Sequence, residues 1–183
     1  MELSPSIPLV ELKKAADRAP GLESEVVELF DELRGPLLRY LLSLGLAAQD
    51  GEEIVQEVFL ALFQHLRKGG GRNNLRGWIF TVAHNQAIKL RQRAAAGPGI
   101  MNGGDTLDSE PNPEEQAVRN QHTRRVKAVI SALPEQDRAC LSLRAEGLRY
   151  REIAGVLGIS LGAVALSLER SLARISRADG RRQ

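Results

Sequence analysis

Two groups of basic side chains are the residues of this sequence whose chemistry is easiest to interpret. Every charged residue from Arg72 to Arg93 is basic, and from Arg170 to Arg182 only Asp179 interrupts a series of arginines. An acidic stretch lies between the groups: Asp105, Asp108, Glu110, Glu114 and Glu115. Because Lys and Arg release counterions from phosphates, this pattern is typical of a protein that binds a polyanion at two places. Solvated helix faces give the same pattern, so charge alone leaves both interpretations open.

The residues that usually carry catalysis or bind metals do not form a set. His65, His84 and His122 are far apart along the chain, and the GGGR sequence at 69–72 lacks the Lys-Ser or Lys-Thr of a phosphate-binding loop. Cys140 lies in an apolar helical context, which favours a core position over a nucleophile. We therefore expect no enzyme, no cofactor and no metal site.

The composition predicts an all-α fold, because apolar residues make up 43% and aromatic residues only 4% of a chain rich in Leu, Ala, Glu and Arg. The net charge of +2 is too small to decide the class of partner. A single cysteine cannot form an intrachain disulfide, and no apolar run approaches the roughly 20 residues that span a bilayer. The N-terminus has no export signal, so we expect a cytoplasmic protein without membrane insertion.

Apolar residues at helical spacing predict the elements that position the basic groups. The predicted helices cover 24–46, which Gly35-Pro36 kinks or divides, then 48–68, 75–95, 113–133 and 135–145. The Gly- and Pro-rich stretch between them cannot bury enough surface to offset its chain entropy. We expect two small helical domains joined by a flexible linker: an N-terminal extension (1–22), a first domain (23–96), an acidic linker (97–112), a second domain (113–178) and a basic tail (179–183).

Residues 150–175 have the pattern of a helix-turn-helix. Ala154 is small where a partner helix would cross, Gly158 permits a sharp turn, and Ser160 can cap a second helix whose first turns would enter the major groove. An ordinary αα-hairpin has a similar pattern.

The segment LPEQDRACLSLRAEGLRYREIAGVLGISLGAV resembles the C-terminal domain of extracytoplasmic function (ECF) sigma factors of the sigma-70 family, which are bacterial transcription initiation factors. In the first half, DGEEIVQEVFLALFQHL is similar to that family's polymerase-docking helix. LRGWIFTVAHNQAIKLRQR is similar to the helix that captures the minus 10 promoter element. The resemblance implies a sigma-2-like first domain and a sigma-4-like second domain in the family's order.

The resemblance also implies the partners and the residues that bind them. Core RNA polymerase would bind through its beta-prime clamp and beta flap, promoter DNA through both domains, and an anti-sigma factor would regulate the protein. The residues implied for the polymerase clamp are Glu52, Glu53, Gln56 and Glu57. Those implied for the minus 10 element, with a flipped base received by the loop 69–74, are Asn73, Asn74, Arg76, His84, Asn85, Lys89, Arg91 and Arg93. Those implied for the minus 35 region are Arg149, Arg151, Ser160, Gly162, Ala163, Ala165, Leu166, Arg170 and Arg174.

Two parts of the sequence depart from the family pattern. His84 stands where an arginine is usual and Lys89 where an aspartate is common. In the second helix of the helix-turn-helix, Leu161, Ala165, Leu166 and Glu169 would face outward and offer no positive charge before Arg170. Either the arginines support an unusual upstream contact, or this surface contacts protein and the chain is a sigma-like DNA-binding or interaction protein.

Overall fold

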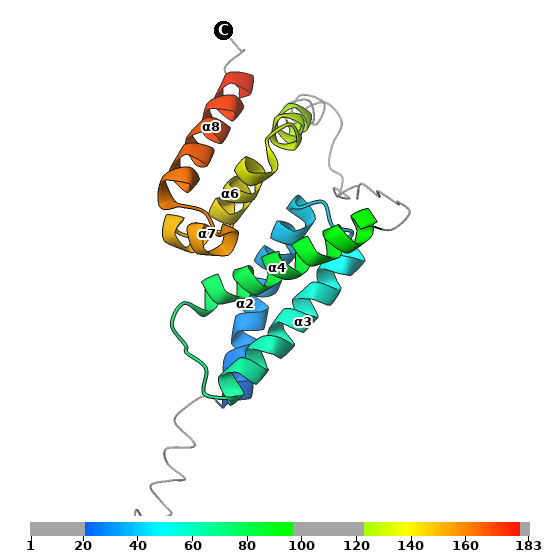
Figure 1. The fold of residues 1–183 in the computed structure, drawn as a ribbon, viewed down its shortest axis with the longest axis vertical. Helices are drawn as coiled ribbons and strands as arrows, with labels where there is room; N and C mark the ends of the chain where they lie inside the picture. The colour runs from blue at the N-terminus through cyan, green and yellow to red at the C-terminus, as the bar shows by residue number, and fades with distance from the viewer. Residues whose placement is uncertain (1–20, 97–122, 180–183) are drawn as a thin grey trace, which may run out of the picture.

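The computed structural model describes residues 21–96 and 123–179, and all regular structure in these two stretches is helical (Figure 1). This confirms the all-α prediction for the described residues. The helices are α2 (Leu22–Ser43), α3 (Ala48–Arg67), α4 (Leu75–Ala96), a helical stretch at 123–131, α6 (Glu135–Ala145), α7 (Tyr150–Leu157) and α8 (Leu161–Asp179). The predicted linker, residues 1–20 of the predicted extension, and residues 180–183 of the tail lie outside the described residues.

Helices α2, α3 and α4 form the first unit, residues 21–96, and pack around their apolar faces. Phe30 of α2 meets Phe59 of α3 edge to face, with ring centroids 5.0 Å apart. The residues of α3 that are buried share one side of the helix, as their spacing predicts: Ile54, Val55, Val58, Phe59, Leu62 and Leu66. Its opposite side is left polar and exposed.

Helix α2 continues through Pro36 as one element rather than as two. A proline inside a helix removes a hydrogen bond and costs about 3 kcal/mol. Four buried side chains flank it, at Leu33, Leu37, Tyr40 and Leu41. Because burial of each such side chain contributes about 1.5–3 kcal/mol, packing on both sides of Pro36 outweighs the lost bond.

Helices α6, α7 and α8 belong to the second unit, residues 123–179, and include the predicted helix-turn-helix. Gly158 has φ = +65°, a left-handed conformation that costs a residue with a side chain about 1–2 kcal/mol. The Ser160 hydroxyl accepts a hydrogen bond from the Ala163 N–H at 3.1 Å, so Ser160 caps α8 as predicted. The two helices cross at 105°. No single helix among the described residues is long and apolar enough to cross a bilayer, although α7 and α8 together meet that test as a bent pair.

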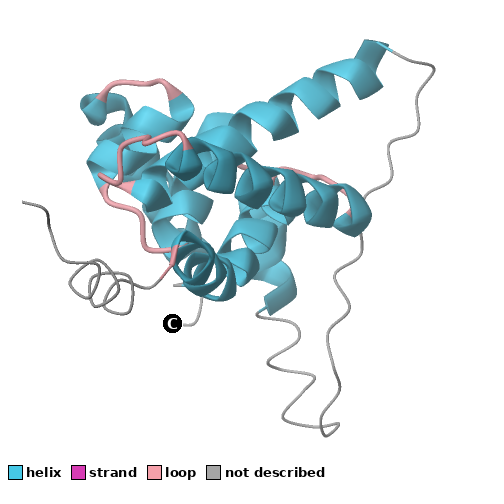
Figure 2. Ribbon diagram, turned by 90° about the horizontal axis from the view of Figure 1, so that it is seen from below, coloured by secondary structure: helices cyan, strands magenta, loops and turns pink. Residues whose placement is uncertain are grey.

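The two units lie against each other and share one hydrophobic core. Helix α4 contacts α7, and α2 contacts α6, so segments far apart in the sequence lie side by side (Figures 1 and 2). The buried apolar residues run without a break from Leu33 in α2, through Phe80 in α4, to Leu143 in α6 and Val164 in α8. The second unit is therefore seated on the helix that carries the first basic group.

Candidate nucleic-acid interface

The polar residues predicted to contact DNA from α4 fall on two different stripes of the helix. At about 100° per residue, Asn85, Lys89 and Arg93 lie within an arc of about 80°. All three are exposed. Another arc of about 80° holds Arg76, His84 and Arg91, which are half-buried. We call these the outer stripe and the inner stripe.

The inner stripe faces the second unit. The Arg76 guanidinium donates a hydrogen bond to the main-chain carbonyl of Glu146 and pairs with Glu32 at 3.3 Å. Arg91 pairs with the carboxylate of Glu135. Two of the arginines predicted to follow the DNA are thus bonded to acceptors in the α6 region.

His84, the third member of the inner stripe, meets a buried tyrosine. The Tyr40 hydroxyl and His84 Nδ1 are 2.8 Å apart. Burial raises the pKa of the Tyr40 phenol well above its usual value, and the charges of Cys140 and Glu135 raise it further. Burial also lowers the pKa of His84, although Glu135 raises it and Arg91 lowers it. Burial thus favours the uncharged forms of both the phenol and the imidazole, which share this hydrogen bond.

The loop before α4, residues 69–74, is held by contacts with α2 and α3. Arg72 makes a bidentate ion pair with Glu25 of α2, with N···O distances of 3.0–3.2 Å, and this hydrogen bonding raises the pKa of the Arg72 guanidinium. His65 stacks on Trp78 at 5.0 Å, and its Nε2 lies 3.3 Å from the Gly71 carbonyl. Trp78 packs against the core, as its phase with Val82 predicts.

Asn74 has a structural task in this loop. It adopts φ = +55°, and its Oδ1 accepts a hydrogen bond from the Gly77 N–H at 3.1 Å, which caps the start of α4. A Cβ at residue 77 would lie only 2.4 Å from Asn74 Nδ2, so Gly77 leaves the space that the cap fills. Asn73 is exposed beside it.

The polar side of α3 presents three of its four predicted polymerase contacts to solvent. Glu53, Gln56 and Glu57 are exposed. Glu52 is half-buried and accepts two hydrogen bonds from Arg34 of α2, at 3.0 and 3.1 Å. One turn beyond Glu57, Leu60 is 60% exposed and adds an apolar side chain to the same side.

The first turns of α8 present an apolar surface. Leu161 and Leu166 are 47% and 51% exposed, and Ala165 and Gly162 are also exposed. Ala163 is half-buried, and the Ser160 hydroxyl is used by the cap. The outward direction predicted for Leu161, Ala165, Leu166 and Glu169 is confirmed.

The arginines of α8 have different environments. Arg170 donates a 2.8 Å hydrogen bond to the carboxylate of Asp137 in α6, and the Asp137 side chain is only 1% exposed. A buried carboxylate needs such a partner, so Arg170 holds α8 against α6. Arg174, one turn later, is exposed.

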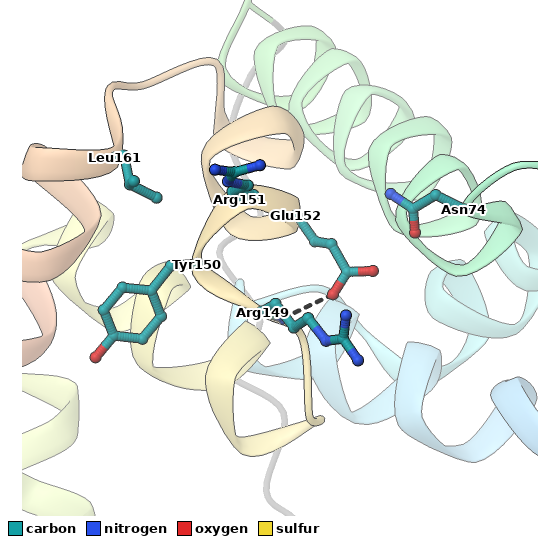
Figure 3. A pocket seen from close by; sticks show the side chains of 6 residues that line it. All are labelled: Asn74, Arg149, Tyr150, Arg151, Glu152 and Leu161. Atoms are coloured by element: carbon teal, nitrogen blue, oxygen red, sulfur yellow. Dashed lines mark hydrogen bonds between the residues drawn. The ribbon is translucent and has the colours of Figure 1, made fainter.

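A cavity of about 590 Å³ opens between the start of α4 and the helix-turn-helix (Figure 3). Its lining residues are Asn74, Arg149, Tyr150, Arg151, Glu152 and Leu161. The Arg149 N–H donates to the Glu152 carboxylate at 2.7 Å, which caps α7. Residues predicted for the minus 10 and minus 35 elements therefore line one cavity.

Four residues that make long-range contacts were not found from the sequence. They are Tyr40 and Asp137, described above, and Arg39 and Glu146, which form an ion pair at 2.6 Å. Because their partners are 33–107 residues away along the chain, no local sequence pattern indicates these contacts. Cys140 was predicted to be a core residue and is fully buried; burial raises its thiol pKa. Among the described residues no group of three or more His, Cys, Asp or Glu could hold a metal ion.

Comparisons with known proteins identify both units. Residues 29–96 match the family model for sigma-70 region 2, and residues 123–175 match that for sigma-70 region 4. The chain is 31% identical over 157 residues to the ECF RNA polymerase sigma factor RpoE of Cereibacter sphaeroides, covering 84% of this chain and 85% of that protein.

Two solved structures have a similar fold. CnrH in complex with the cytosolic domain of CnrY has a TM-score of 0.60 and 21% identity, covering 95% of this chain and 97% of that one. RpoE of Bartonella quintana in complex with the anti-sigma factor NepR has a TM-score of 0.63 and 18% identity, covering 90% and 100%.

Replacement of Arg170 tests its structural role. Arg170→Ala leaves the buried Asp137 carboxylate unpaired and is expected to lower the free energy of unfolding by about 1–3 kcal/mol. Arg174→Ala removes an exposed charge from the same helix and is expected to change it by less than about 0.5 kcal/mol. Urea unfolding followed by circular dichroism measures both. Equal losses of unfolding free energy in the two variants would contradict the structural role of Arg170.

The burial of His84 predicts a pH dependence of stability. The folded-state pKa of His84 lies below the ordinary value of 6.5. As the pH falls through that value, the unfolded chain takes up a proton that the folded chain resists, so the native state loses stability. His84→Gln keeps an acceptor for Tyr40 and does not titrate. We expect the stability of the unmodified chain, relative to this variant, to decrease from pH 7.5 to pH 5.5 in urea titrations. A constant difference would contradict a lowered His84 pKa in the folded chain.

Proposed function

The chain belongs to the sigma-70 family, in the group of ECF RNA polymerase sigma factors, and on this premise we propose that it binds core RNA polymerase and directs promoter-specific transcription initiation. One observation carries the proposal. Regions 2 and 4 occur in one chain and in this order, on the two units that carry the basic groups. The protein would act where the polymerase is, in the cytoplasm.

The exposed side of α3 is proposed to bind the beta-prime clamp. Glu53, Gln56 and Glu57 provide acidic and amide groups for a basic partner surface. Glu52 contributes less, because Arg34 already holds its carboxylate.

The outer stripe of α4 and the loop before it are proposed to bind the minus 10 element. Asn85, Lys89 and Arg93 are exposed together and can follow the sugar–phosphate backbone. Asn73 in the adjacent loop is exposed, so its amide can reach a base edge. Asn74 caps α4 with its carbonyl oxygen and supports the loop.

The second unit is proposed to contact the minus 35 region, through arginines rather than through the first turns of α8. Arg149, Arg151 and Arg174 are exposed, whereas Arg170 is paired with Asp137.

A second function, protein binding by the start of α8, is favoured by a specific observation. The exposed Leu161 and Leu166 suit a protein partner, such as the beta flap or an anti-sigma factor, better than a phosphate backbone.

An anti-sigma partner is part of the proposal. Both solved structures of similar fold are complexes with a second protein, and NepR is named as an anti-sigma factor. Those complexes support the proposal of a partner of the same class for this chain.

Run-off transcription tests the proposed function. With core polymerase and a promoter mapped from transcript starts after overexpression, the chain is expected to give one defined start site.

The double variant Lys89→Ala/Arg93→Ala should lower the affinity for minus 10 DNA about tenfold. It should also reduce the slope of log K against log salt by about 1.5. Arg124→Ala/Arg125→Ala removes the same charge from the other unit and should leave minus 10 binding nearly unchanged. The absence of any specific transcript would exclude the function.

Footprinting of the polymerase complex tests the upstream contact. Protection of the minus 35 region is expected, and Arg151→Ala/Arg174→Ala should remove it without loss of fold, because both side chains are exposed. Leu166→Ala should leave it unchanged. If protection of the minus 35 region persisted in the arginine variant, the result would favour the alternative that this surface binds protein. Arg170 is unsuitable for this test because its loss also destabilises α8.

A further inference from the structure

The loop 69–74, which is proposed to receive a base, has few side chains of its own to hold its shape. Its first three residues are glycines, and glycine loses more conformational freedom on ordering than any other residue. At the other end of the loop, Arg72 pairs with Glu25 and Asn74 caps α4. The glycine end therefore depends on contacts from outside the loop.

His65, in the last turn of α3, supplies such a contact. Its imidazole ring lies on the Trp78 indole, with ring centroids 5.0 Å apart and an interplanar angle of 25°. Its Nε2 lies 3.3 Å from the carbonyl oxygen of Gly71. Because a carbonyl oxygen can only accept, Nε2 carries the proton of this hydrogen bond. One side chain thus joins the end of α3, the glycine end of the loop and the first turn of α4.

Gly70 leaves the space in which the His65 ring lies. A Cβ at residue 70 would lie 2.3 Å from Nε2 and 2.4 Å from the adjacent ring carbon, too close for atoms that are not bonded. The ring cannot move aside freely, because Trp78 covers one of its faces. A Cβ at residue 71 would meet nothing within 4 Å. Of these two neighbouring glycines, only the first is required by the position of His65.

The shape of the loop matters for Asn73, which lies between the fixed ends and is exposed. A flipped base must already offset the stacking that it has lost. A binding loop that is ordered before its ligand arrives loses less conformational freedom on binding, so it binds more tightly than a loop that must be ordered at that moment. The contacts of His65 provide this order in the free protein.

We propose that His65 is a positioning residue for minus 10 recognition, which holds the loop 69–74 through Trp78 and Gly71 so that Asn73 is presented to the captured base. This rests on the proposed function for the identity of the ligand. His65 acts through the loop and does not itself contact the DNA. The phosphate contacts proposed for the outer stripe of α4 do not depend on it.

The test uses the full chain bound to core polymerase and a labelled forked minus 10 DNA, whose nontemplate strand is either intact or carries one abasic site. The captured position is the one at which an abasic site weakens binding by the unmodified chain most. His65→Ala is expected to weaken binding of the intact strand about 3- to 10-fold, because the loop is no longer ordered in advance. It should leave binding of the strand that is abasic at the captured position nearly unchanged, since no base remains there to be received. Fluorescence anisotropy measures both affinities.

Gln64→Ala is the matched control, because it truncates the exposed neighbour of His65 in the same turn of α3. It should match the unmodified chain on both strands. A general loss of stability or of polymerase binding would instead weaken binding of the intact and the abasic strands by the same factor.

Gly70→Ala gives a second route to the same state, because its Cβ displaces the His65 ring without altering that residue. It should weaken binding of the intact strand as His65→Ala does. The double variant should bind no more weakly than His65→Ala alone, because the ring that the new Cβ would meet is absent.

The emission of Trp78 reports the stack directly, because it is the only tryptophan in the sequence. In the free chain, loss or displacement of the His65 ring exposes one face of the indole to water. The emission should therefore shift to longer wavelength in His65→Ala and in Gly70→Ala. Gly71→Ala, whose Cβ enters open space, should leave the emission unchanged.

Equal losses on the intact and abasic strands, or no loss on either, would overturn the role of His65 and leave the proposed function in place. Additive losses in the double variant, or an unshifted emission in His65→Ala, would overturn it as well. If the polymerase complex of the unmodified chain does not bind the forked DNA at all, the proposed function itself fails, and a shifted emission then reports a structural contact only.

Discussion

A buried phenol needs a hydrogen-bond partner, and the position of Tyr40 sets how the helices around it are turned. Tyr40 has no exposed surface, lies 5.7 Å from the Phe80 ring, and bonds to His84. With His84 directed inward, the periodicity of α4 turns Lys89 outward. It also turns Arg91 toward Glu135. Together with the buried apolar residues Phe80, Ala83 and Ala87, this contact fixes which stripe of α4 meets solvent and which receives the second unit.

Two arginine–carboxylate pairs in this structure differ in how deeply they are buried. Inside the second unit, Arg170 meets an Asp137 that is 1% exposed, and the pair is part of the folded core. Between the units, the partner of Arg91 is 53% exposed. Water and salt screen such a pair, so its contribution is small. The structure thus combines a buried arginine–carboxylate pair inside the second unit with an exposed pair at the contact between the units.

Much of the local structure could be predicted from the sequence, because its causes are local. Apolar spacing located α3, α4 and α6, and Gly158 and Ser160 marked the turn and cap of the helix-turn-helix. The candidate site was harder to predict. Helical spacing already places Arg76 and Lys89 on different stripes, but which stripe is covered depends on a partner 70 residues away. The roles of Glu146 and Asp137 likewise depend on tertiary neighbours that are distant in the sequence.

The cap at the start of α4 has a consequence for how sequences of this kind can vary. The amide of Asn74 occupies the space that a side chain at residue 77 would need, with a Cβ there only 2.4 Å from Nδ2. Asparagine is also one of the few residues that readily adopt the left-handed backbone found at position 74. The two positions therefore constrain each other. An alanine at position 77 would displace the Asn74 amide, and the start of α4 would lose the hydrogen bond that the Asn74 carbonyl oxygen now accepts from residue 77.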